Sequence, residues 1–72
     1  MTKKMKPFPY SIEEVGQIIT TNINCGRTLY ESLTTLGATL GYSAEAVRRY
    51  WNSYAMFHSI EYNNKLKKIV EV

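Results

Sequence analysis

Apolar residues recur at helical spacing near the start of the chain. They stand three or four positions apart, at Ile12, Val15, Ile19 and Ile23. Ser11 and Glu14 have the spacing of a capping box, and Tyr10 precedes Ser11 where a hydrophobic staple would pack against Val15. Asn24 and Gly26 suit a C-terminal turn. The pattern predicts a helix that begins after Ser11 and ends by residues 25–26.

A second apolar stripe follows. Its members are separated by four, three and four positions, at Leu29, Leu33, Leu36 and Leu40. Thr28 and Glu31 repeat the capping-box spacing, and Gly41 is the natural stop. Gly37 lies inside this predicted helix, where glycine costs about 1 kcal/mol relative to alanine. It indicates that another helix passes close by, or else it is simply tolerated.

A third helix is predicted after Ser43, which has the position and chemistry of an N-cap. Its apolar face holds Val47, Trp51 and Tyr54, with Tyr50 and His58 alongside. Trp51 has two readings, a nucleobase-stacking platform or the core of a small domain, and its spacing from Val47 favours the core.

The last fourteen residues are expected to be helical too. Tyr62, Leu66 and Ile69 recur at spacings of four and three. Whether this segment continues the third helix or breaks near Asn63 and Asn64 is left open. The predicted fold class is therefore all-α, with an arm at residues 1–10, a three-helix domain at 11–58 and a C-terminal helical extension at 59–72.

The segment from Leu33 to Asn52, LTTLGATLGYSAEAVRRYWN, has the layout of a helix-turn-helix. Two helices joined by three or four residues approach closely, which favours a small residue such as Gly37. Gly41 supplies the positive φ that the turn needs, and Val47 anchors the second helix in the core. Each feature alone is weak, but together they predict this motif.

The polar face of the third helix is the candidate DNA-reading surface. Arg48, Arg49 and Asn52 lie opposite Val47 and Trp51. Arginine pairs with guanine and asparagine with adenine in the major groove, and such a helix contacts bases mainly from its N-terminal part. The candidate base-contacting residues are Ser43, Ala44, Glu45, Arg48, Arg49 and Asn52. The alternative is a solvated face that carries two arginines by chance.

The three-helix part of the chain resembles a known family. Residues 11–58 are similar to Myb/SANT-like, homeodomain-like three-helix domains, and LGYSAEAVRRYWNSY resembles small bacterial Myb-like regulators, including prespore-specific ones. The match lies at Leu40-Gly41, Arg49 and Trp51–Tyr54, with Tyr50 inserted between the arginine and the tryptophan. A Myb repeat usually has a tryptophan in its first helix, where this chain has Ile and Val. The resemblance implies sequence-specific binding of double-stranded DNA.

Charge adds the ends of the chain to this picture. The 72 residues carry nine Lys and Arg against six Glu, a formal net charge of +3. Lys3, Lys4 and Lys6 form one cluster, and a basic N-terminal arm of a homeodomain-like protein often lies in the minor groove. The alternative is a solubilising, disordered tail.

Catalysis has few candidates in this sequence. It contains no Asp, and His58 reads as a half-buried helix residue rather than a base. Cys25 has no second cysteine with which to form a disulfide or a zinc site, and neighbouring Glu13 and Glu14 point about 100° apart on a helix. We expect no enzyme activity, no cofactor or metal and no small-molecule substrate. Without an apolar membrane span or signal sequence, a cytoplasmic location is expected.

The competing function is a protein-interaction module that binds the transcription machinery, another regulator or itself. The predicted C-terminal stripe of Tyr62, Leu66 and Ile69 is the feature behind it. These residues would pack onto the first helix of the same chain or form a homodimer seam. A dimer would recognise two half-sites about one helical turn apart.

Overall fold

Each helix begins at a side-chain cap that the sequence marks. The computed structural model describes residues 8–72, in which α1 spans Ile12–Asn24, α2 spans Leu29–Leu40 and α3 spans Ala44–His58. Ser11 Oγ accepts from the Glu14 amide at 3.1 Å, and the Glu14 carboxylate accepts from the Ser11 amide at 2.8 Å. The same reciprocal pair joins Thr28 and Glu31. Ser43 accepts from the Ala46 amide at 3.3 Å. Both predicted capping boxes and the third N-cap are confirmed.

The first two helices end where the sequence indicated. Cys25 is the C-cap of α1, and Gly26 follows with φ +103°. Gly41 is the C-cap of α2 in the left-handed conformation, with φ +80°. Glycine adopts this conformation without the steric cost that a Cβ carries, so the chain can reverse sharply at both points.

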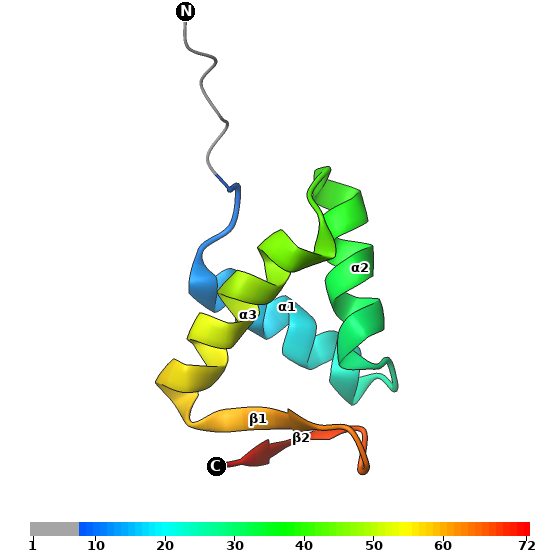
Figure 1. Ribbon diagram of the computed structural model, residues 1–72, viewed down its shortest axis with the longest axis vertical. Coiled ribbons are helices and arrows are strands. Elements are labelled where there is room, and N and C mark those ends of the chain that lie inside the picture. The colour runs from blue at the N-terminus through cyan, green and yellow to red at the C-terminus, as the bar shows by residue number, and fades with distance from the viewer. Residues whose placement is uncertain (1–7) are drawn as a thin grey trace, which may run out of the picture.

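The helices pack around one small core, with α3 against both α1 and α2 (Figure 1). The buried side chains come from all of them: Val15, Ile19 and Ile23 from α1, Leu33 and Leu36 from α2, Val47 and Trp51 from α3. Trp51 is only 3% exposed, which confirms its place in the core. The one buried polar residue of the described chain, Ser32, donates from Oγ to the Thr28 carbonyl at 2.9 Å.

Gly37 is buried and faces the connection between α2 and α3. A Cβ at this position would lie 2.6 Å from the Tyr42 carbonyl oxygen and 3.2 Å from that of Ser43. The Tyr42 amide donates back to the Gly37 carbonyl at 2.7 Å. The close approach expected at Gly37 is therefore present, but its partner is the backbone of the turn that leads into α3.

The predicted C-terminal helix is wrong. Helix α3 ends at His58, and its C-cap Ser59 has a left-handed φ of +54°. The chain continues as strands β1 (Ile60–Asn63) and β2 (Lys68–Glu71). The strands form an antiparallel hairpin in which Tyr62 lies opposite Ile69 (Figure 1). The fold is mostly helical with a small two-stranded sheet, so the all-α class does not cover the last fourteen residues.

The apolar residues that suggested a C-terminal helix belong to one face of the hairpin, with Leu66 as the exception. Ile60, Tyr62 and Ile69 pack against the helical core from one face of the hairpin. Leu66 lies in the loop between the strands and is 58% exposed. The helical stripe proposed for Tyr62, Leu66 and Ile69 is therefore wrong, because the first and last meet across the hairpin while Leu66 points elsewhere.

Packing begins at Phe8, within the segment expected to be an arm. Its ring stacks on Tyr50 with centroids 4.2 Å apart and lies 4.8 Å from the ring of Tyr42. Tyr10 also packs against the core, next to the start of α1. Lys3, Lys4 and Lys6 lie outside the described residues.

Candidate nucleic-acid interface

The surface of α3 opposite the core is polar and open. Val47 and Trp51 face inward, and the exposed residues on the far side recur at spacings of four, three and four. We call this stripe the outer face of α3; it consists of Glu45, Arg49, Asn52 and Met56. Nothing in the described chain covers it. Its first three members are polar or charged, and Met56 is apolar.

Arg48 and Arg49 differ in exposure although they are adjacent. Arg49 and Asn52 are exposed on the outer face, whereas Arg48 is half-buried at its flank. Helical spacing puts Asn52 next to both arginines, four residues after one and three after the other. The structure brings Arg48, Arg49 and Asn52 together. Of the two arginines, Arg49 has the side chain that is better placed to extend away from the protein.

The N-terminal candidates on α3 are not equivalent. Ser43 is exposed, but its hydroxyl oxygen already accepts from the Ala46 amide. Ala44 is half-buried and packs against the core, so its methyl group is only partly accessible to a ligand. Glu45 is exposed on the outer face. Of these three, Glu45 has the freest side chain.

An aromatic cluster that sequence reasoning missed borders the outer face. Phe8 stacks on Tyr50 and packs at a tilt against Tyr42. These three rings line a hollow of about 360 Å³ that Glu45 and Arg49 also line. The signal in the sequence was a single aromatic residue between Pro7 and Pro9, an unusual composition for a solvated tail. The cluster holds Phe8 against one flank of α3.

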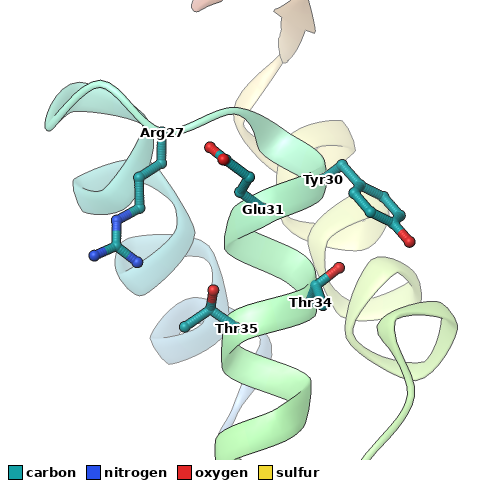
Figure 2. A pocket seen from close by; sticks show the side chains of 5 residues that line it. All are labelled: Arg27, Tyr30, Glu31, Thr34 and Thr35. Carbon is teal, nitrogen blue, oxygen red and sulfur yellow. The ribbon is translucent and has the colours of Figure 1, made fainter.

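A second hollow, of about 270 Å³, lies on the exposed side of α2 (Figure 2). It is lined by Arg27, Tyr30, Glu31, Thr34 and Thr35. Tyr30 and Thr34 project from one flank of the helix, and Glu31 and Thr35 from the other (Figure 2). The Glu31 carboxylate already caps α2 by accepting from the Thr28 amide. The hollow is an open surface without converging reactive groups.

The single histidine joins two helices. His58 Nε2 lies 2.7 Å from Glu13 Oε2, and its ring lies 4.3 Å from that of Tyr54. The sequence predicted a half-buried helix residue, and 44% of the His58 side chain is exposed. This pair connects the end of α3 to the start of α1.

Other chemical features of the described chain are limited. Cys25 is exposed and free. Within residues 8–72, no three His, Cys, Asp or Glu side chains cluster closely enough to hold a metal ion. None of the described helices has both the length and the apolar character to cross a membrane.

Comparisons with protein-family models, with curated proteins and with solved structures each gave no match.

Proposed function

We propose that this chain is a sequence-specific double-stranded DNA-binding protein, a small transcriptional regulator that places α3 in the major groove. The proposal keeps the homeodomain-like, Myb-like reading of the three-helix unit. The observation that carries it is the exposed pair Arg49 and Asn52 on the helix that directly follows a three-residue turn.

The first support is the helix–turn–helix geometry. Only Gly41, Tyr42 and Ser43 separate α2 from α3, and Gly37 lets the turn backbone pack directly onto α2. This contact fixes the direction in which α3 leaves α2. Core anchors at Val47 and Trp51 hold one side of α3, so the opposite side is free over its whole length.

The second support is the chemistry of the outer face. B-form DNA has a major groove about 12 Å wide that admits one α-helix. Arg49 can donate two hydrogen bonds to guanine O6 and N7, and Asn52 can pair with adenine N6 and N7. Glu45 can accept from a cytosine amino group, while Arg48 at the flank suits a phosphate. Lys3, Lys4 and Lys6 would add minor-groove or backbone contacts.

Selection from random duplexes at physiological salt tests this function. A regulator of this kind enriches one sequence and loses affinity steeply as salt rises, because phosphate contacts release counterions. Arg27→Ala is the charge-matched control for arginine-to-alanine variants of α3, because it removes one exposed arginine from the α1–α2 connection. It should leave base preference unchanged. Enrichment of no sequence, together with salt-independent or absent duplex binding, would overturn the proposal.

A second candidate function is a protein-interaction module. Met56 and Phe57 are 80% and 79% exposed at the end of α3, and with Ile12 they line an apolar hollow of about 360 Å³. Large exposed apolar side chains of this kind favour protein contacts. If this reading is right, Phe57→Ser abolishes self-association or partner binding measured by sedimentation, and the wild-type chain binds no duplex. A monomer at high micromolar concentration would remove the homodimer form.

A further inference from the structure

The hairpin loop concentrates positive charge at one point of the surface. Residues 63–68 contain three lysines and no acidic residue. We call Lys65, Lys67 and Lys68 the lysine tip; all three are exposed. Within residues 8–72, an ion pair joins His58 to Glu13, and none of the tip lysines takes part in an ion pair. The charge of the tip is therefore available to an outside anion.

Two hydrogen bonds to one residue give the loop a defined shape. The Asn63 carbonyl oxygen accepts from the Lys67 amide at 2.6 Å, and Asn63 Oδ1 accepts from the Leu66 amide at 2.8 Å. Behind the loop, Tyr62 and Ile69 pack on the core. The lysines thus extend from a fixed base.

The tip is also connected rigidly to α3. Only Ser59 separates α3 from β1, and the Val72 amide donates to the Ser59 carbonyl at 2.8 Å, closing the far end of the hairpin. Figure 1 shows the hairpin running from the end of α3 across the base of the helical unit. Any ligand that orients α3 therefore orients the lysine tip as well.

Lys67 stands where a glycine would fit more easily. Its φ of +55° lies in the left-handed region, which residues with a Cβ rarely adopt and which hairpin loops usually assign to glycine or asparagine. Lysine at this position is less favourable for the turn than glycine, but it adds a third positive charge to the loop. This favours a role for the charge over a role in forming the turn.

We propose that the lysine tip binds the phosphate backbone of the DNA duplex, outside the base pairs that α3 reads. The inference rests on the proposed function and adds a second contact surface to it. Along the chain, Asn52 to the end of α3 covers about 9 Å and β1 with its flanking residues about 17 Å. Asn63, which pairs with Lys68 at the base of the tip, therefore lies within about 26 Å of Asn52, less than one helical turn of DNA at about 34 Å.

The test compares a triple variant, Lys65→Gln, Lys67→Gln and Lys68→Gln, with the triple arginine variant that keeps the charge. Each protein is titrated with a duplex restricted to the selected sequence and with one extended by about ten base pairs on both sides. Three lost phosphate contacts lower the salt slope by about 2.7. Between 50 and 200 mM salt the wild-type protein should then lose about 40-fold more affinity for the long duplex than the glutamine variant.

The outcomes separate charge, loop shape and function. Arginine variants that keep the wild-type slope, and glutamine variants that still select the same sequence with a reduced slope, support the tip. An unchanged slope in the glutamine variant overturns it while leaving base reading by α3 intact. Equal losses in the glutamine and arginine variants assign the effect to loop conformation and also overturn it. A wild-type chain that binds neither duplex overturns the proposed function together with this inference.

Discussion

The aromatic ring of Tyr54 lies directly on Gly16, where α3 meets α1. A Cβ at Gly16 would overlap the ring carbons of Tyr54. The Trp51 ring stacks on that ring with centroids 5.7 Å apart, and the centroid of the His58 ring lies 4.3 Å from it. A residue without a side chain is therefore what allows α1 and α3 to approach this closely.

Gly16→Ala should lower the stability of the protein by about 1–3 kcal/mol, because the added methyl group overpacks a filled site. Alanine in a helix interior normally stabilises relative to glycine by up to about 1 kcal/mol, so the sign itself is informative. Gln17→Ala, an exposed change in the same helix, is the control and should be near neutral. Thermal unfolding should show a decrease in Tm of roughly 5–20 °C for the first variant. A Tm that rises would contradict this packing.

Gly37→Ala should destabilise the protein by a similar or larger amount, about 2–4 kcal/mol. The obstacle is the backbone carbonyl of Tyr42, which cannot rotate away as a side chain would. Urea unfolding measures the effect, with exposed Thr34→Ala in the same helix as the control. If the variant folds, its α2–α3 turn should be displaced, and binding of the selected duplex should weaken as well. Unchanged stability and binding would show that the turn does not depend on this contact.

Phe8→Ala should cost about 1–3 kcal/mol, since it removes a ring stacked on Tyr50 and close to Tyr42. Tyr30→Ala removes an aromatic ring that is 65% exposed and should have little effect. Denaturant midpoints of the two variants test the difference. Equal midpoints would mean that Phe8 is not part of the folded unit.

Arg49→Ala should weaken binding of the selected duplex by about 1–3 kcal/mol and relax the preference for one base. Arg48→Ala should weaken binding with little change in base preference, because a half-buried flank position suits a phosphate contact. Repeating the duplex selection with each variant distinguishes the roles. Relaxed specificity in Arg48→Ala alone would reverse the assignment.

Helix starts and stops were predictable because their causes are local. Ser11, Thr28 and Ser43 each accept from an amide three residues further on, and Gly41 supplies the left-handed turn residue. Such signals depend on a few adjacent residues, so one sequence is enough to recognise them. The core position of Trp51 followed from helical periodicity in the same way.

The hairpin was missed because strands of four residues display too little alternation to be distinguished from a helical stripe. Tyr62 and Ile69 are seven residues apart, a distance equally suited to two helical turns and to opposite positions in a short hairpin. Asn63 and Asn64, which are typical turn residues, are the signals that distinguish a hairpin from a helix here.

The candidate site was only partly predictable. The residue set around Arg49 and Asn52 followed from the helix, but which arginine is exposed depends on how α3 rotates against its neighbours. The pairing of Gly16 with Tyr54 and the Phe8 stack join distant segments and leave no local pattern.

The contact between His58 and Glu13 joins residues 45 positions apart in sequence. By contrast, the capping boxes, the α2–α3 turn and the hairpin each close within about a dozen residues or fewer. Closing a long loop costs more chain entropy than closing a short one, and that cost is recovered only when the contact has formed. We therefore predict that docking of α3 onto α1 limits the folding rate, and that variants at the Gly16–Tyr54 contact change the refolding rate measured by stopped flow more than variants at any cap.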